Sequence, residues 1–457
     1  MREPTYILYE KMVVELSSFL LVGGEEEGDF SLAMDGSGNY IIPAASIAGA
    51  LRAYLSASRS AIGQWFGERT DKESHGSESC VYFYDAICKD IEIEKRNGIQ
   101  IDGALGTEAN LFTQYMIGQG MTTELRMQAF LKDENECGII KELLIDAAAG
   151  IQEGHLTFGA KKSNGGGIFN VIEIGNKILN TSDKEDFMEY LKGPDIIFEQ
   201  IKCNKYHDNK ACSIKNRVSE FTEFELTAEI PDGIIIKSDE KKASVHSVYG
   251  KREVNSVNVK KTVNGKPCYY IPSSTIKGAL KGYGKKAGRY LGITEEETEM
   301  LFGGEVDGIK YRSHVRAQDV LLEDVNTSIC NRIQIDRWLG SIIEGANSNQ
   351  EILSTKEGKC IHVRVTTDGE DKRKRNLLNA LVFLALRDLG LGLVPIGSGS
   401  AVGLGRLNGK TLSIDGVTVP FSKQGVLFKN TSEDEEALKR KVLDWLEEVQ
   451  TYADKKD

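Results

Sequence analysis

The sequence repeats a series of short segments in the same order, and this repeat constrains the fold more than any other feature. Ile42–Arg52, which reads Ile-Pro-Ala-Ala-Ser-Ile-Ala-Gly-Ala-Leu-Arg, returns at Ile271–Lys281 as Ile-Pro-Ser-Ser-Thr-Ile-Lys-Gly-Ala-Leu-Lys. Ile99–Asp102, Ile-Gln-Ile-Asp, returns letter for letter at Ile333–Asp336. Repetition of this kind indicates a duplicated structural unit. We therefore expect two related domains, whereas 457 residues alone suggest about three.

Three further matches extend the repeat and set its boundaries. They are Trp65–Glu68 with Leu301–Gly304, Tyr82–Asp85 with Arg316–Asp319, and the glycine-rich Gly159–Gly167 with Gly397–Gly405. From these matches we predict a first domain at 1–180, a polar linker with a short helix at 181–215, a second domain at 216–420 and a C-terminal segment at 421–457.

Hydrophobic patterning predicts the same order of elements in both repeats, β-α-β-β-α-β, which is the ferredoxin-like or RRM-like arrangement of an α+β fold. The predicted strands cover 11–21, 81–87 and 123–131, then 223–230, 314–322 and 360–366; the second helices cover 139–151 and 376–389. Such a sheet carries its helices on one face, so we expect the other face to be free for a ligand.

The C-terminal segment predicts an amphipathic helix. Ser432–Glu435 reads as a capping box, and one face of the helix behind it carries Leu438, Val442, Trp445, Leu446 and Val449. Such a helix packs on its own protein more often than on a partner.

Charge is distributed unevenly along the chain. A net charge of -11 argues against a protein that grips nucleic acid alone, because phosphate binding needs clustered lysine and arginine. However, residues 251–292 hold ten Lys or Arg and a single acid, Glu253. This basic stretch surrounds the helix after Pro272, where Ser273 or Ser274 is expected to cap the first turn and leave its N–H groups as an anion site. The alternative is a capped helix that packs closely through Gly278.

The glycine-rich segments do not match a nucleotide-binding loop. Neither ends in Gly-Lys-Ser/Thr, and each follows a helix and precedes a strand, so we expect no nucleotide cofactor. Their glycines are expected to expose backbone N–H groups, with added charge from Lys161, Lys162 and Arg406, which suits a sugar-phosphate chain. An ordinary flexible connection is the alternative.

The remaining composition indicates a cytoplasmic protein. There is no signal-peptide pattern, no apolar run of membrane-spanning length and no Cys-x-x-Cys pair among eight cysteines. We therefore predict no membrane partner. Cys203, His207 and Cys212 have part of a zinc-knuckle spacing but lack its first cysteine.

Taken together, the motifs resemble one family. Pro-Ser-Ser-x-x-Lys-Gly, Leu-Phe-Gly, a strand with Asp, Ile-Asp-Arg and a loop ending Gly-Leu-Gly-Arg are similar to the RAMP superfamily. More narrowly, they resemble the RNA-binding backbone subunits of type III CRISPR effector complexes. The resemblance covers both repeats, which implies a tandem fusion of two such domains. It implies guide RNA, target RNA and the other type III effector subunits as partners.

The resemblance also implies where RNA is held. The helix after the Pro-Ser-Ser step and the glycine-rich loop would contact the guide through Ser46, Arg52, Lys161, Lys162, Ser273, Ser274, Lys277, Lys281, Ser398, Ser400 and Arg406. The excursions at 103–122 and 337–358 resemble the thumb, a hairpin that wedges between guide and target. Its wedge residues would be Leu105, Phe112 and Met116, then Trp338, Leu339 and Ile342, unless these pack under their own loops.

Catalytic members of the family place an aspartate between the first strand and the Pro-Ser-Ser helix. The matching residue here is Asp29, which would hold a divalent cation, Mg or Mn, or accept the 2′-OH proton of target RNA. Asp35 is the runner-up, but its Asp-Gly-Ser-Gly setting is typical of a turn. The second repeat offers only Asn255 or Asn258 nearby, so we expect the first domain to cleave and the second only to bind. The alternatives are a purely structural RNA-binding subunit, a guide-RNA-processing endoribonuclease, or a protein unrelated to RNA.

Overall fold

The computed structural model describes residues 4–23, 25–26, 29–30, 32–56, 62–67, 78–102, 105–207, 221–238, 243–247, 250–263, 265–343, 348–369, 371–429 and 432–454. Only the backbone is described at 25–26, 29–30, 97–102, 105–112, 243–247, 250–253 and 452–454. The chain divides into two compact units, 1–162 with 166–219, and 163–165 with 220–457, which are described separately.

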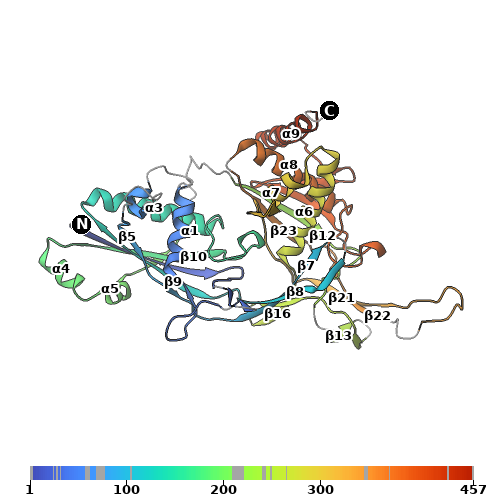
Figure 1. Cartoon of the computed structure of the whole chain (residues 1–457), viewed down its shortest axis with the longest axis horizontal. Coiled ribbons are helices and arrows are strands. Elements are labelled where there is room, and N and C mark those ends of the chain that lie inside the picture. Colours follow the sequence, from blue (N-terminus) through green and yellow to red (C-terminus); the bar gives the residue numbers. More distant parts are fainter. Residues whose placement is uncertain are drawn as a thin grey trace. The chain divides into compact units, whose positions relative to one another are not determined.

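The first unit is built on one antiparallel sheet with two main helices. Along the chain come β1 (Tyr6–Leu16), α1 (Ala44–Ser56), β5 (Val81–Phe83), β9 (Thr122–Leu131), α3 (Glu134–Gln152) and β10 (Phe169–Asn180). The strand order is β11-β10-β1-β9-β5, where β11 is Asn204–Lys205 (Figure 1). Without the edge strand β11, this is the predicted β-α-β-β-α-β arrangement.

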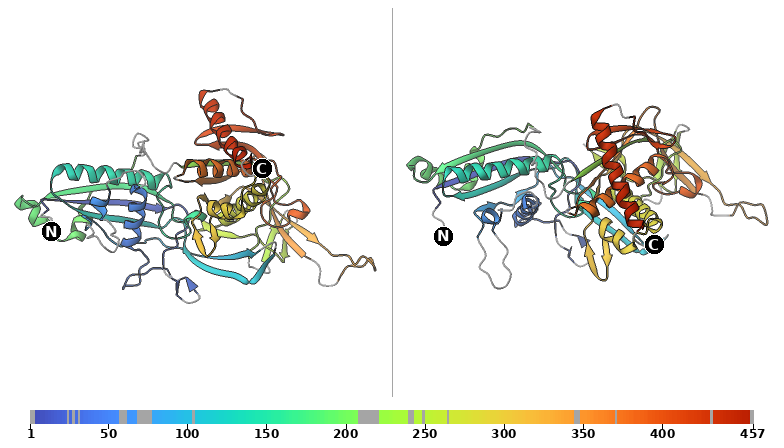
Figure 2. Two further views of the ribbon diagram at one scale, coloured as in Figure 1. Left: turned by 45° about the horizontal axis from the view of Figure 1, so that its top comes forward. Right: turned by 90° about the horizontal axis from the view of Figure 1, so that it is seen from above.

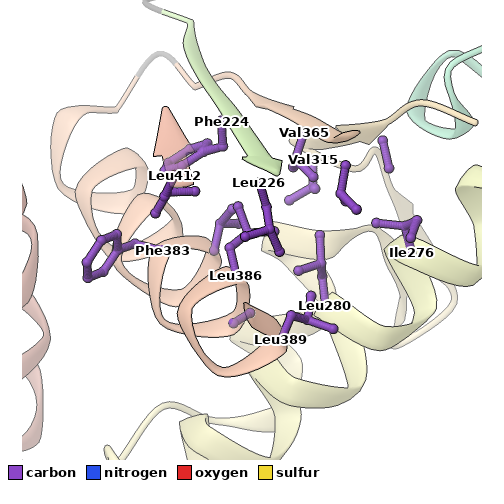
Figure 3. Close-up of a cluster of buried hydrophobic side chains, with 14 of the residues drawn as sticks. Phe224, Leu226, Ile276, Leu280, Val315, Val365, Phe383, Leu386, Leu389 and Leu412 are labelled. Atoms are coloured by element: carbon purple, nitrogen blue, oxygen red, sulfur yellow. The ribbon is translucent and has the colours of Figure 1, made fainter. Parts of the chain in front are cut away.

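The second unit repeats this order. It contains β12 (Thr222–Glu229), α6 (Ser273–Tyr290), β19 (Val315–Ala317), β23 (Ile361–Thr367), α8 (Lys372–Gly390) and β24 (Asn408–Ile414). The sheet runs β19-β23-β12-β24-β25-β26, with β25 at Val417–Ser422 and β26 at Gly425–Val426. Figure 3 shows Leu226 of β12 and Val365 of β23 packed against Leu280 of α6 and Leu386 of α8.

Two details confirm that the repeat is structural. The register of β1 against β10 shifts between Val13 and Val14, and that of β12 against β24 shifts between Thr227 and Ala228. The second helices also begin alike. Asp133 accepts a hydrogen bond from the backbone N–H of Glu136 at the start of α3, and Asp371 accepts one from Lys374 at the start of α8.

Residues 184–205 are folded onto the first unit. They form α4 (Lys184–Tyr190), α5 (Pro194–Gln200) and β11, which pairs with β10. Phe198 of α5 is fully buried, and its ring lies edge-on to that of Tyr9 with 5.4 Å between centroids. Over these residues the segment is therefore not an open linker, and the sheet face that was expected to be free is covered by α5.

Each unit projects one long hairpin. In the first it is β7 (Ile93–Asp102) with β8 (Leu105–Ile117), and in the second β21 (Val325–Arg332) with β22 (Ser348–Thr355). Figures 1 and 2 show β21 and β22 extending away from the body of the second unit. Both hairpins begin earlier than the predicted excursions at 103–122 and 337–358, because residues before Ile-Gln-Ile-Asp already pair as a strand.

The two hairpins are anchored in the same way. The backbone of Leu20, just after β1, exchanges two hydrogen bonds with Ile117 of β8, at 2.8 and 2.9 Å. Ile234, just after β12, exchanges two with Leu353 of β22, at 2.8 and 3.1 Å. The base of each hairpin is thus fixed to the segment that leaves the first strand of its own sheet.

A shorter hairpin lies between the first strand and the first helix of each unit. It is β2 (Glu25–Glu26) with β3 (Asp29–Phe30) in the first, and β13 (Ala243–Ser247) with β14 (Gly250–Val254) in the second. The other elements are α2 (Gly63–Phe66), α7 (Glu295–Phe302), β4 (Ile41–Ile42), β6 (Ala86–Ile87), β15 (Lys260–Val263), β16 (Lys266–Ile271), β17 (Gly304–Val306), β18 (Ile309–Tyr311) and β20 (Val320–Leu322).

The C-terminal helix α9 (Glu433–Asp454) packs on α8 and β25 of the second unit. Its predicted apolar face is buried, with Leu438, Val442, Trp445 and Val449 in the core. This confirms that the helix packs on its own protein. At the start of α9, Ser432 Oγ accepts from the Glu435 N–H at 3.2 Å, as the capping box predicts, and the Glu435 carboxylate also accepts from the Lys429 N–H.

Candidate nucleic-acid interface

In both units the first helix is capped by an aspartate that follows an edge strand of the sheet, β5 or β19. The Ala44 N–H donates to Asp85 Oδ1 at 2.7 Å, and the Ser273 N–H donates to Asp319 Oδ1 at 2.9 Å. Pro272 is the N-cap residue of α6 and makes no side-chain cap. The expectation that Ser273 or Ser274 caps the helix was therefore wrong. A negative charge already satisfies this end of the helix dipole, so the end is not an open anion site.

The lysines of α6 are engaged by α7. Lys281 Nζ donates to Glu299 Oε2 at 2.6 Å and to the Gly303 carbonyl at 2.8 Å, and Lys285 pairs with Glu299 at 2.7 Å. Burial alone would raise the pKa of Glu299, but the two lysines outweigh it and lower that pKa. Since Glu295 also pairs with Lys285, the acids of α7 partly neutralise the basic stretch that ends at residue 292.

The remaining residues predicted on the two first helices are differently exposed. Ser274 is exposed, whereas Ser273 is buried and its hydroxyl donates to the Asn164 carbonyl at 2.5 Å. Lys277 Nζ donates to Ser163 Oγ at 2.8 Å; residues 163–165 cluster with the second unit. On α1, Ser46 and Arg52 are half-buried.

The glycine-rich loops are clasped by the segment that follows the first strand. The Ala160 and Gly167 N–H groups donate to the Leu21 and Phe19 carbonyls, both at 2.7 Å. The second unit repeats this geometry, with the Ser398 and Gly405 N–H groups donating to Ile235 and Gly233 at 2.8 Å. These N–H groups are thus used internally, contrary to the expectation that the loops expose them.

The glycines permit close approach of two backbones. A Cβ on Gly167 would lie 1.7 Å from the Phe158 carbonyl oxygen, and one on Gly405 would lie 2.0 Å from that of Ile396. Each loop is therefore a fixed platform with a short helical turn, Lys162–Asn164 or Ser400–Val402. The predicted contact residues Lys162, Ser400 and Arg406 are exposed on these loops, while Lys161 and Ser398 are half-buried.

The tip of the second hairpin presents large apolar side chains to solvent. Trp338 is 97% exposed, Leu339 80% and Ile342 60%. Asp336 builds the turn that carries them, because its Oδ1 accepts from the N–H groups of Trp338 at 2.8 Å and Leu339 at 2.9 Å. These hydrogen bonds lower the pKa of Asp336. The predicted wedge residues of this hairpin do not pack under their own loop.

The first hairpin differs from the prediction at one wedge residue. Met116 is 4% exposed and packs with Phe19 and Leu21 at the base of the hairpin, so it cannot serve as a wedge at the tip. Its place in β8, next to the anchoring Ile117, is the reason. Leu105 and Phe112 lie in β8, and their side chains are outside the described residues.

Asp29 lies beside the first hairpin. It opens β3, where its backbone pairs with Glu26, and β3 is in contact with β8. Its side chain is outside the described residues. Asp35 forms the predicted turn: its carboxylate accepts from the Ser37 and Asn39 N–H groups and from the Asn39 side chain. No group of three or more His, Cys, Asp or Glu with metal-binding geometry occurs among the described residues, which do not include Cys212.

The second unit places its expected counterparts of Asp29 differently. Asn258 is buried, with Oδ1 accepting from the Ile236 N–H at 2.7 Å and Nδ2 donating to the Glu351 carbonyl at 2.9 Å. Glu351 is fully buried at the base of the second hairpin and also accepts from Tyr269 at 2.5 Å. Asn258 is thus a structural tie to the hairpin. Asn255 is exposed and follows directly after β14.

The comparison with known families decides the affiliation of the chain. The sequence profile of the RAMP superfamily matches residues 14–170 and 196–408, so it covers both units. The chain belongs to the RAMP superfamily. RAMP proteins are CRISPR-associated RNA-binding proteins that bind crRNA within CRISPR complexes. A search of curated protein sequences gives no match to the chain. Among the helices of the described ranges, none is both long and apolar enough to cross a membrane.

Proposed function

We propose that this RAMP protein is a tandem backbone subunit of a type III CRISPR effector complex. It binds guide RNA along both units and cleaves bound target RNA from the first. The observation that carries the proposal is the repeated pairing of a β-α-β-β-α-β sheet with one anchored, projecting hairpin. A subunit with two equivalent hairpins would interrupt a guide–target duplex at two points.

Guide binding is supported by the loops and the second hairpin tip. Lys162, Ser400 and Arg406 lie on clasped loops, where the backbone is already fixed by hydrogen bonds and little backbone entropy remains to be lost on binding RNA. Trp338 and Leu339 are preformed apolar surfaces against which unstacked bases can lie. Lys281 contributes to guide binding mainly by holding α7 against α6.

Target cleavage is assigned to Asp29. The adjacency of β3 and β8 supports it, because a nucleotide displaced by the first hairpin would lie near this residue. In the proposed step the 2′-oxygen attacks phosphorus, the bond from phosphorus to the 5′-oxygen breaks, and Asp29 accepts the 2′-OH proton. The 5′-oxygen takes a proton from water, and a 2′,3′-cyclic phosphate results. A divalent cation, Mg or Mn, is part of this proposal.

The decisive variant is Asp29→Asn in the full chain, assembled with its partner subunits and guide. We expect loss of target cleavage by at least about 100-fold with guide binding unchanged, since a general base contributes about this much. Asp35→Asn is the matched control, because Asp35 is committed to its turn. Full cleavage at every position by the Asp29→Asn complex would contradict the assignment. It would favour a subunit that only binds RNA, with cleavage carried out by other subunits. Cleavage that persists in excess EDTA would contradict the cation requirement.

A further inference from the structure

Three basic side chains, two arginines and a histidine, meet one carboxylate at the edge of the second sheet. Asp368, directly after β23, accepts from His314 Nδ1 at 2.8 Å, from Arg316 at 3.2 Å and from Arg312 at 3.4 Å. Asp368 is buried, whereas the side chains of Arg312, His314 and Arg316 are 65%, 29% and 19% exposed. We name these four residues the edge cluster.

The edge cluster lies on the face of the sheet opposite α6 and α8. Val315 and Ala317 of β19 are in the core, so alternation places Arg316 on the other side. In β23, Val363 and Val365 are buried while Arg364 between them is exposed. In the described residues of the second unit, no helix covers this face as α5 covers it in the first.

The first unit forms the same edge without these basic side chains. The Phe130 N–H donates to the Cys80 carbonyl at 2.9 Å, and the Asp368 N–H donates to the His314 carbonyl at 3.0 Å in the equivalent place. Tyr82 then corresponds to Arg316, and the rings of Tyr82 and Phe130 meet edge-on with 5.5 Å between centroids. An aromatic pair therefore suffices for this part of the fold, and the fold itself does not require the charged cluster.

The cluster carries more positive than negative charge. Burial would raise the pKa of Asp368, but His314 and the two arginines outweigh it and lower that pKa, so Asp368 is a carboxylate at neutral pH. His314 must then donate through Nδ1, and its Nε2 has no hydrogen-bond partner in the described part of the chain. Arg312 pairs with no other described carboxylate, and its guanidinium extends into solvent.

We propose that Arg312, His314 and Arg316, oriented by Asp368, bind a phosphodiester group of RNA at the edge of the second sheet. Guanidinium groups recognise phosphate oxygens through paired N–H donors, and a carboxylate behind them fixes their direction. The site would add an RNA contact to those proposed at the clasped loops and the hairpins. This inference rests on the proposed RNA-binding function.

The test compares binding of a single-stranded RNA oligonucleotide to the full chain over a range of salt concentrations. Removing both guanidiniums with Arg312→Gln and Arg316→Gln should weaken binding about tenfold. It should also reduce the slope of log K against log salt by about 0.7 for each lost phosphate contact. Arg364→Gln is the matched control, because Arg364 is exposed on the same face but paired with Glu225 at 2.8 Å. We expect it to bind within about twofold of wild type.

A second variant guards against misfolding. Arg316→Tyr with Asp368→Phe gives the second unit the aromatic pair of the first, so it should stay folded; with Arg312→Gln added, both guanidiniums are again absent and the same affinity should be lost. Unchanged affinity and salt slope in folded variants, with wild type binding RNA, would overturn this inference alone. A wild-type chain that binds no RNA would overturn both the inference and the proposed function. Loss of binding to an acidic peptide but not to RNA would assign the cluster to a protein partner and overturn it.

Discussion

The first sheet is covered on both faces, whereas the second is covered on one. In β1 the consecutive residues Ile7, Leu8, Tyr9 and Glu10 are all buried, because α3 lies on one side and α5 on the other. In β12 buried residues alternate with partly exposed ones. The two units share strand order, bulge, carboxylate cap and loop clasp, so these features define the scaffold. The units differ at the sheet face and its edge, which are therefore where their roles diverge.

The largest effect is expected from a substitution that removes the cover of the first sheet. Phe198→Ala should lower the free energy of unfolding of the first unit by about 4 kcal/mol, because a fully buried aromatic ring is lost. Denaturant unfolding followed by hydrogen exchange would assign the change to one unit. Leu191→Ala is the control, since Leu191 is 59% exposed at the end of α4 and should cost under about 0.5 kcal/mol. A loss below about 1 kcal/mol for Phe198→Ala would show that α5 is not part of this core.

The carboxylate caps allow a second comparison between the units. Asp319→Ala should destabilise by about 3 kcal/mol and Asp85→Ala by about 1 kcal/mol, because both lose a helix cap but only Asp319 also pairs with a buried Lys261. Asp319→Asn keeps an acceptor for the helix and removes the charge, so it separates the two effects. Thermal unfolding of the three variants checks the order. Equal losses for the two alanine variants would contradict it.

The two cores also differ at one strand position, where the first buries a glutamate, Glu10. Burial raises its pKa to about 8, although Lys141 opposes this; the equivalent strand position in the second unit is the buried Phe224. Between about pH 4.5 and pH 8 the folded chain holds a proton that the unfolded chain has released. Stability therefore falls as the pH rises through this window, by at most about 1.4 kcal/mol per pH unit.

The variant Glu10→Gln removes this titration. We expect it to be more stable than wild type by about 2 kcal/mol at pH 9 and not more stable at pH 5, as measured by urea unfolding of the full chain. Phe224→Leu, at the equivalent position, is the control and should show no pH-dependent difference from wild type. A Glu10→Gln difference that is the same at both pH values would contradict a buried, neutral carboxyl group.

The sequence was sufficient for the features that local patterns encode. The paired motifs revealed the duplication, strand alternation predicted β9 and β23, and the Leu438–Val449 face predicted how α9 packs. The sequence showed that an aspartate is repeated, as Asp85 and Asp319, but not that it caps a helix. Asp319 caps a helix that begins 46 residues earlier, and no local pattern reports a contact over that distance.

Long-range contacts also account for the site features that sequence reasoning missed. The basic stretch was counted to residue 292, but Glu295 and Glu299 lie just beyond it and fold back onto α6. Met116 looked like a wedge because it is apolar and lies in the excursion, yet the anchor at Ile117 fixes it in the core. The edge cluster joins residues 312–316 to Asp368, and only the pairing of β19 with β23 brings them together.

Both units are proposed to hold one guide RNA. The identity and length of the RNA that co-purifies with the chain test this proposal. The full chain would be expressed with its partner subunits and a guide-encoding array, and the bound RNA sized and sequenced. We expect small RNA of a narrow length distribution from the array, strongly reduced by Trp338→Ala combined with Arg406→Gln. Absence of RNA, or RNA of random length and origin that ignores these substitutions, would contradict the account.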